Sequence, residues 1–161
     1  MSKKATKAAD NIYCIARYDA TKTNDSFSSR EKASELLHIE RTRLSNIELG
    51  NIKPYPDEVL TMAKAYNCPE LCNSYCACEC PIGATSVKKV EIEDFDRLAL
   101  KVLGSLKDID QLRSSLIEIS EDGVITKDEK VEFDTILDTL DKISTNAKAL
   151  QLWAQKNIHC E

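Results

Sequence analysis

The sequence predicts an all-α protein, with a small domain of five short helices followed by a long antiparallel helical hairpin. Three observations lead to this prediction. Apolar residues recur every three or four positions within residues 28–50, which is the spacing of one helix face. The same spacing continues over two longer stretches, residues 95–116 and 133–150. Residues that start and stop helices, Ser28 and Gly50, stand at the ends of the first segment.

The length and composition are those of a protein with one or two small domains. The chain has 161 residues, of which 42% are hydrophobic, so it can bury a substantial core. No apolar run approaches the roughly 20 residues that span a bilayer, and the start of the chain lacks the apolar segment of a signal peptide. We therefore expect a cytoplasmic protein with no membrane segment. In that compartment the seven cysteines would be reduced thiols or metal ligands.

The net charge of −5 does not exclude a nucleic-acid partner, because the charge is unevenly distributed. Residues 1–67 contain 11 Lys and Arg against 9 Asp and Glu, whereas residues 84–161 contain 11 against 16. The field that attracts phosphate is the local one at the docking face. The amino-terminal part is therefore the candidate for contact with DNA.

Helices are expected on either side of residues 28–50. Residues 1–10 form a tail, either a solvated end or a basic arm that reaches DNA. The helix over residues 11–20 has its core positions at Ile12, Ile15 and Ala16, and Phe27 should pack back on the domain. The helix over residues 56–66 can be capped by Asn67. Its expected core residues are Val59, Leu60, Met62, Ala63 and Tyr66.

Residues 28–50 are predicted to form two short helices around a tight turn. Ser28 and Glu31 stand at capping-box spacing, so the first helix begins near Ser29. His38 stands at the turn, where histidine tolerates a left-handed backbone conformation better than most residues do. The residues expected in the core here are Ala33, Leu36, Leu37 and Ile39.

The second helix of this pair buries Leu44 and Ile47 and stops at Gly50. Its outward side carries guanidinium, hydroxyl and amide groups, which can read base edges in the major groove. The alternative is the exposed polar face of an ordinary helical domain. The outward residues are Arg41, Thr42, Arg43, Ser45 and Asn46.

This helix pair resembles the helix-turn-helix of the Cro and phage-repressor class, also called the XRE family. The match rests on the run Ile47-Glu48-Leu49-Gly50 and on residues 56–66, which look like the fourth helix of that family. Ser34 and His38 depart from the pattern, because the family usually has alanine and glycine there. The resemblance implies a lambda-repressor-like DNA-binding domain of five helices, with its helix-turn-helix region over residues 11–67.

The resemblance also implies which side chains meet DNA. The residues on base-contacting positions are Arg41, Thr42 and Asn46. Arg41 could bind guanine and Asn46 adenine, each through two hydrogen bonds. Glu48 is expected to tie the helix end to the domain. Contacts to phosphate are expected from Arg30, Arg43, Ser45 and Lys53.

Residues 68–84 are predicted to form a separate cysteine-rich helix and connector. A rigid helix cannot bring Cys68 and Cys76 onto one ion, since they lie about 12 Å apart along its axis. Thiols could converge if the chain folds back, and would then hold zinc or an iron–sulfur cluster. The alternative is that they serve as small apolar residues. The pattern YCxxxCPIG, residues 75–83, looks like a tail of some regulators of this class and implies no particular ligand. The candidate ligands are Cys72, Cys76, Cys78 and Cys80, to which His159 and Cys160 could add donors.

Residues 85–161 are predicted to form the hairpin, with one apolar seam on each arm. Two such helices make a thin core, so pairing with a second copy into a four-helix bundle is expected. The link, residues 118–129, partly matches a calcium-binding loop, but Thr126 and Glu129 also match the capping box of a helix start. The seam residues are Phe95, Leu98, Val102, Leu106, Ile109, Leu112 and Leu116 on the first arm, and Phe133, Ile136, Leu140, Ile143, Ala147 and Leu150 on the second.

These features predict a sequence-specific DNA-binding transcriptional regulator. It would be a homodimeric repressor that reads the major groove of double-stranded DNA with residues 41–46. Two alternatives remain open: a metal- or redox-sensing regulator that uses the cluster from Cys68 to Cys80, and a protein-interaction adaptor that acts through the C-terminal hairpin. An enzyme is not expected, because the chain has two histidines, no nucleophile–base pattern and no glycine loop for phosphate.

Overall fold

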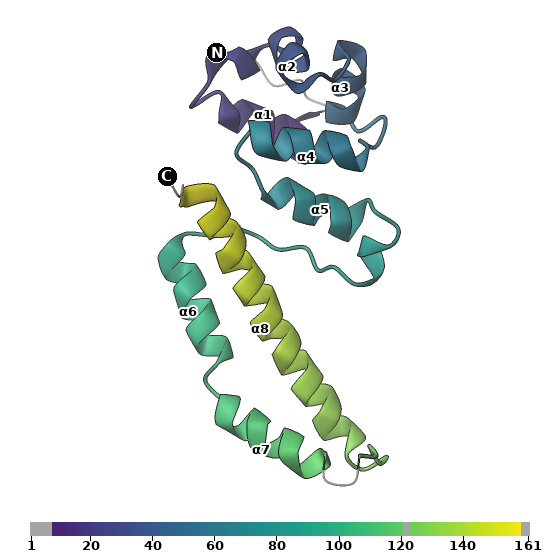
Figure 1. Cartoon of the computed structure of the whole chain (residues 1–161), viewed down its shortest axis with the longest axis vertical. Helices are drawn as coiled ribbons and strands as arrows, with labels where there is room; N and C mark the ends of the chain where they lie inside the picture. The colour runs from purple at the N-terminus through teal and green to yellow at the C-terminus, as the bar shows by residue number, and fades with distance from the viewer. Residues whose placement is uncertain (1–7, 121–122, 159–161) are drawn as a thin grey trace. The chain divides into compact units, whose positions relative to one another are not determined.

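The computed structural model describes residues 8–120 and 123–158. Every regular element in these residues is a helix, which confirms the predicted all-α class. The chain divides into two compact units, with the boundary between Lys89 and Val90. Figure 1 colours the helices of the first unit from purple to teal and those of the second from green to yellow. None of the helices in the described ranges is long and apolar enough to cross a membrane.

The first unit contains five α-helices and the short 3-10 helices η2 and η3 within residues 8–89. The α-helices lie within a few residues of the positions predicted from the sequence. The elements are α1 (Ile12–Ala20), η2 (Asp25–Ser28), α2 (Arg30–Leu37), α3 (Arg41–Glu48), α4 (Pro56–Ala65), α5 (Glu70–Cys78) and η3 (Gly83–Thr85).

Side chains at the helix starts supply the acceptors that the first turns need. Asn11 begins α1 by accepting from two amides of the first turn at 3.0 and 3.1 Å. Ser29 begins α2, where its hydroxyl accepts from the amide of Glu31 at 3.2 Å. The predicted capping box of Ser28 with Glu31 is wrong, because Ser28 ends η2 and Ser29 takes the extended backbone conformation of an N-cap.

Three helices of the first unit end at a left-handed residue. These residues are His38 after α2, Gly50 after α3 and Asn67 after α4, with φ angles of 54°, 72° and 49°. In each case the amide of the next residue bonds to a carbonyl five positions earlier, which is the pattern of a Schellman motif. The predicted roles of His38 and Asn67 at helix ends are confirmed. The bonds are Ile39 to Ser34 at 3.1 Å, Asn51 to Asn46 at 2.9 Å and Cys68 to Ala63 at 2.9 Å.

The core of the first unit is formed by the inward faces of α1 to α5. Phe27 packs on it as predicted, edge to face with Tyr66, with ring centroids 5.1 Å apart. Two residues predicted in the core, Leu36 and Leu60, are 50% and 53% exposed, because a helix packed on one side buries only a narrow arc of its surface. Ile12 and Ile15 are partly buried, and Ile12 packs against the core as predicted.

The cysteine-rich helix α5 packs as part of the first unit. Leu71 is buried in the common core, and Cys72 and Tyr75 pack against it. Gly83 of η3 lies directly on the backbone of α5. A Cβ added at Gly83 would stand 2.2 Å from the carbonyl oxygen of Cys76, so only glycine fits this approach.

The second unit consists of α6 (Phe95–Ser105), α7 (Ile109–Ile119) and α8 (Lys130–Asn157) within its described residues. Helices α6 and α7 both pack along α8 (Figure 1). The first arm of the predicted hairpin is therefore wrong as a single helix, because it breaks at residues 106–108. Gly104 and Ser105 lower the helix propensity there. The amide of Leu106 is shared between two carbonyls, each at 3.2 Å, which tightens the last turn of α6.

The core of the second unit consists of two small clusters. One contains Val90, Leu98, Ala149 and Leu152, and the other contains Leu112, Ile119 and Ile136. Much of the predicted seam remains uncovered within one chain, since four of its residues are between 38% and 53% exposed. These residues are Phe95, Leu106, Ile109 and Leu140.

The hydrogen bonds between Thr126 and Glu129 form as predicted, but they lie in a turn before α8, whose N-cap is Glu129 and not Thr126. The amide of Thr126 donates to the carboxylate of Glu129 at 2.8 Å, and the amide of Glu129 lies 3.4 Å from the hydroxyl of Thr126. Residues 121–122 of the calcium-like loop lie outside the described residues.

Gly83→Ala is expected to destabilise the first unit by about 1–3 kcal/mol, because the added methyl group would overlap the carbonyl of Cys76. The matched control is Gly104→Ala in α6, where an added Cβ meets nothing within 4 Å. This control should gain about 0.5–1 kcal/mol of stability from helix propensity. Urea unfolding followed by circular dichroism measures both changes. Equal effects of the two substitutions would contradict the close packing of η3 on α5.

Candidate nucleic-acid interface

Helices α2 and α3 pack against each other and are joined by the turn from His38 to Glu40. On its inward side α3 buries Leu44 and Ile47, as predicted. The opposite side carries the polar residues that the sequence assigns to DNA. Of these, Arg41 and Thr42 are exposed, whereas Arg43, Ser45 and Asn46 are partly buried.

A carboxylate occupies the start of α3. The two oxygens of Glu40 accept from the backbone amides of Thr42 at 2.9 Å and Arg43 at 2.8 Å. These two bonds lower the pKa of Glu40 below its ordinary value, and the charge of Arg41 adds to the effect. Because the Glu40 side chain is exposed, a negative charge stands beside the polar face. The sequence held a signal for this cap, since the helix dipole favours an acidic residue at a helix start.

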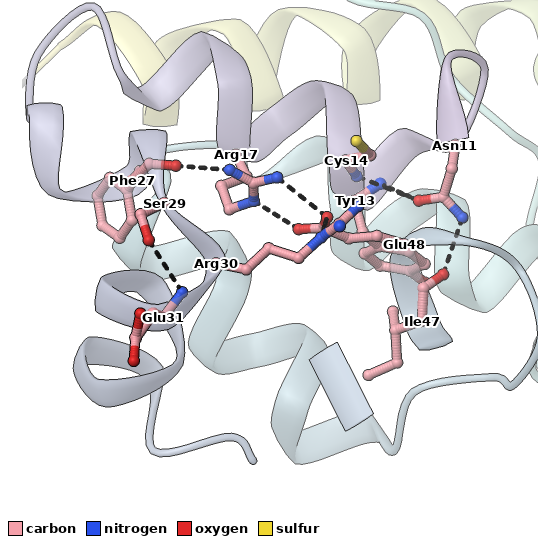
Figure 2. A network of polar contacts seen from close by, with 10 residues as sticks. All are labelled: Asn11, Tyr13, Cys14, Arg17, Phe27, Ser29, Arg30, Glu31, Ile47 and Glu48. Carbon is pink, nitrogen blue, oxygen red and sulfur yellow. Dashed lines mark hydrogen bonds and ion pairs between the residues drawn. The ribbon is translucent and has the colours of Figure 1, made fainter. Parts of the chain in front are cut away.

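A buried ion pair holds the other end of α3 (Figure 2). Arg17 of α1 and Glu48 of α3 are 1% and 0% exposed. Arg17 donates Nε and Nη2 to the two carboxylate oxygens of Glu48 at 2.5 and 3.0 Å, and Nη1 to the carbonyl of Phe27 at 2.6 Å. Arg30, at the start of α2, donates Nε to the same carboxylate at 2.6 Å. One carboxylate therefore joins three helices.

The geometry of this network keeps Arg17 charged. Burial alone would lower the pKa of Arg17, but the hydrogen bonds and the charge of Glu48 raise it above its ordinary value. The structural role expected for Glu48 is confirmed, whereas its partner Arg17 was not predicted. The available signal is its spacing, four positions after the buried Tyr13. Asn11 adds a second link, donating Nδ2 to the carbonyl of Ile47 at 3.0 Å (Figure 2).

Arg43 is held against α4, although the sequence predicted a phosphate contact. Its Nε and Nη2 donate to the two carboxylate oxygens of Glu58, the second at 2.8 Å. Its guanidinium carbon lies 4.1 Å from the ring centroid of Tyr55. Burial would raise the pKa of Glu58, but the bonds from Arg43 and from the amide of Tyr55 lower it. Arg43 therefore fixes α3 on α4 with a bidentate bond and a stacked ring.

Lys53 and Asn46 also make contacts within the chain. Lys53 follows α3 and donates Nζ to the carbonyl of Glu79 at 3.3 Å. The side chain of Glu79 accepts from the hydroxyl of Tyr13 at 2.5 Å, so the end of α5 is tied to α1 and to the loop after α3. Asn46 accepts a hydrogen bond from the side chain of Asn51 at 3.1 Å.

Arg41 differs from the other predicted cations of this face. Its side chain is exposed, and its guanidinium makes no hydrogen bond or ion pair with the residues that the structure describes. Arg30, Arg43 and Lys53 each donate to another group of the chain. Of these four predicted cations, Arg41 therefore keeps all of its hydrogen-bond donors available for a ligand.

The cysteines predicted as metal ligands are not brought together as a set. Among residues 8–120 and 123–158, no group of three or more His, Cys, Asp or Glu side chains could hold a metal ion. Cys72, Cys76, Cys78 and Cys80 form no disulfide. Burial, with the neighbouring Cys76, raises the pKa of Cys72, which favours the thiol over the thiolate that a metal needs. The added donors His159 and Cys160 lie outside the described residues.

No protein-family model, curated protein or solved structure matches the chain. The geometry of α3 and of the residues around it is therefore the basis for the function proposed below.

Glu48→Gln is expected to lower the free energy of unfolding of the first unit by about 3 kcal/mol, because the buried guanidinium of Arg17 loses its charged partner. The double variant Arg17→Met/Glu48→Leu should lose less, because it removes both fully buried charges. Arg30 also loses its partner there, but its side chain is 29% exposed and can be solvated. Glu35→Gln removes an exposed carboxylate from α2 and is the control, with a change below about 0.5 kcal/mol. Denaturant unfolding measures all three. Equal stability of Glu48→Gln and the control would contradict the assigned role of the network.

Proposed function

We propose that the chain is a sequence-specific DNA-binding transcriptional regulator of the helix-turn-helix type. The observation that carries this proposal is the sidedness of α3, which buries Leu44, Ile47 and Glu48 while Arg41 and Thr42 are exposed. A helix divided in this way, joined to the preceding helix by a short turn, suits docking in the major groove. The resemblance of the same residues to the Cro and phage-repressor class supports the proposal.

In this proposal the exposed start of α3 reads base edges. Arg41 binds a guanine through two guanidinium nitrogens, and Thr42 contacts a neighbouring base. Asn46 stands one turn further along the same helix and can contact an adenine with the amide donors that its bond to Asn51 leaves. Ser45 supports these contacts at the phosphate backbone.

The other basic residues have two roles. Arg30 and Arg43 first hold α2 and α4 to α3 through carboxylates of the chain. Contact with phosphate would then use the guanidinium nitrogens that remain. Lys53 is exposed and can exchange its carbonyl partner for a phosphate oxygen, because its bond of 3.3 Å is long.

The regulator is a cytoplasmic homodimer that binds double-stranded DNA. The second unit supplies the dimer interface. Helix α8 has 28 residues, which makes it about 42 Å long. The apolar seam of this unit is only partly covered within one chain, since Leu140 of α8 is 40% exposed and Ile109 of α7 is 41% exposed. A second copy would cover this seam and place two reading helices on paired half-sites.

A protein-interaction adaptor is the second candidate function. Leu100, Leu103 and Val131 of the second unit are 69%, 66% and 75% exposed, and exposed apolar groups of this size favour a protein partner. This candidate predicts DNA binding no stronger at one site than at random sequence. The described residues add no support for the metal-sensing alternative.

Arg41→Ala is expected to weaken binding to the preferred duplex by about 1–3 kcal/mol and to remove discrimination at one base pair. The free energy of unfolding should not change, because the side chain is exposed and makes no bond within the described chain. The preferred duplex is selected from a randomised library, and binding is measured by fluorescence anisotropy at several salt concentrations. Lys32→Ala, which removes an exposed cation from α2, is the control. An unchanged sequence preference in Arg41→Ala would show that α3 is not the reading helix.

Leu140→Asp is expected to convert the dimer to a monomer, because it places a charge in the apolar seam of α8. The control is Leu60→Asp, which adds a charge at a similarly exposed leucine of the first unit. Light scattering after size-exclusion chromatography gives the mass of each species. A wild-type chain that is monomeric at micromolar concentration would contradict the proposed dimer.

A further inference from the structure

An exposed carboxylate stands at the start of α3, beside the residues proposed to contact DNA. Glu40 is the first side chain of the polar face, directly before Arg41. Its position is fixed, because both oxygens accept backbone amides of the first turn at 2.9 and 2.8 Å. Serine, threonine, aspartate and asparagine cap helices at least as well. Capping alone therefore does not require a glutamate here.

A carboxylate at this place opposes DNA binding unless the groove provides a donor for it. The start of a recognition helix points at the base edges, between two phosphate backbones that repel a negative charge. An ionised carboxylate has about four lone-pair positions, of which the amides of Thr42 and Arg43 use two. The remaining positions can accept a hydrogen bond from a base. The major groove presents two amino donors, N4 of cytosine and N6 of adenine, and carboxylates pair with cytosine because adenine also presents the N7 acceptor.

We infer that Glu40 is a specificity-determining residue that accepts a hydrogen bond from the N4 amino group of a cytosine. The inference rests on the proposed DNA-binding function and deepens it. Arg41 is adjacent and exposed, with its donors available for the O6 and N7 atoms of guanine. The two residues together select a half-site in which a cytosine stands within one base-pair step of the guanine bound by Arg41.

The fixed position of Glu40 makes this reading selective. Its side chain is already ordered by the two amide bonds, so contact with cytosine costs little additional rotamer entropy. Thymine presents an O4 acceptor and guanine presents O6 and N7 acceptors at the groove edge, and each of these repels a carboxylate. Adenine presents its N6 amino donor beside the N7 acceptor, so attraction and repulsion partly cancel there. Glu40 therefore discriminates by attraction to cytosine and by repulsion from thymine and guanine.

The test is a selection of duplexes from a randomised library by the purified full chain and by Glu40→Ser. Serine keeps a capping oxygen and removes the charge. The wild-type chain should enrich a cytosine beside the guanine of Arg41, and Glu40→Ser should lose the cytosine preference by about tenfold while it keeps the guanine. Glu35→Ser makes the same charge change at an exposed site on α2, and should leave both preferences unchanged.

A second variant keeps the inference testable if Glu40→Ser is poorly folded by circular dichroism. Glu40→Gln keeps the length and the capping oxygen, and its amide should move the preference at this position from cytosine toward adenine. Identical base preferences in the wild-type chain and a folded Glu40 variant overturn the inference, with Glu40 then only a cap. A wild-type chain that enriches no sequence overturns the DNA-binding function itself, which is a distinguishable result.

Discussion

The ion pair between Arg17 and Glu48 sets the position of α3, and with it the direction of the polar face. Both groups are removed from water, so separating them would leave two uncompensated charges in the core. The same guanidinium also bonds to the carbonyl of Phe27 just before α2. Any tilt of α3 would therefore disturb α1 and the start of α2 together. The orientation of the polar face of α3 therefore depends on a buried interaction on the opposite side of the helix.

Arginine side chains serve the architecture of this domain as much as its surface. Arg30 is bound to Glu48, and Arg43 is bound to Glu58 and stacked on Tyr55. Their charges are locally neutralised, so the positive field at the polar face is weaker than the basic residue count implies. In the proposed function, DNA binding would then depend more on direct contacts to bases and less on the general attraction to phosphate. An acidic cap at the start of α3 fits a protein that favours selectivity over non-specific affinity.

The sequence was sufficient to predict the positions of the helices in the first unit, because capping and stop residues act over only a few positions. His38 and Asn67 could be placed at helix ends on their tolerance of a left-handed backbone alone. The partners of Arg43, Lys53 and Glu48 could not be predicted, since they join residues distant in the chain that only packing brings together. The break between α6 and α7 was also missed. The continuous apolar seam predicted one long helix, and the low helix propensity of Gly104 and Ser105 was too weak a signal to indicate the break.

The thin second unit has a consequence for how such a protein would respond in a cell. Its two apolar clusters share no common core, and in the proposed homodimer a second copy would cover the rest of its seam. Ordering of this unit and association of two chains would then be a single equilibrium governed by mass action. Occupancy of a paired DNA site would rise more steeply than in proportion to the amount of protein. The abundance of the chain itself could therefore act as the signal, without a small-molecule effector.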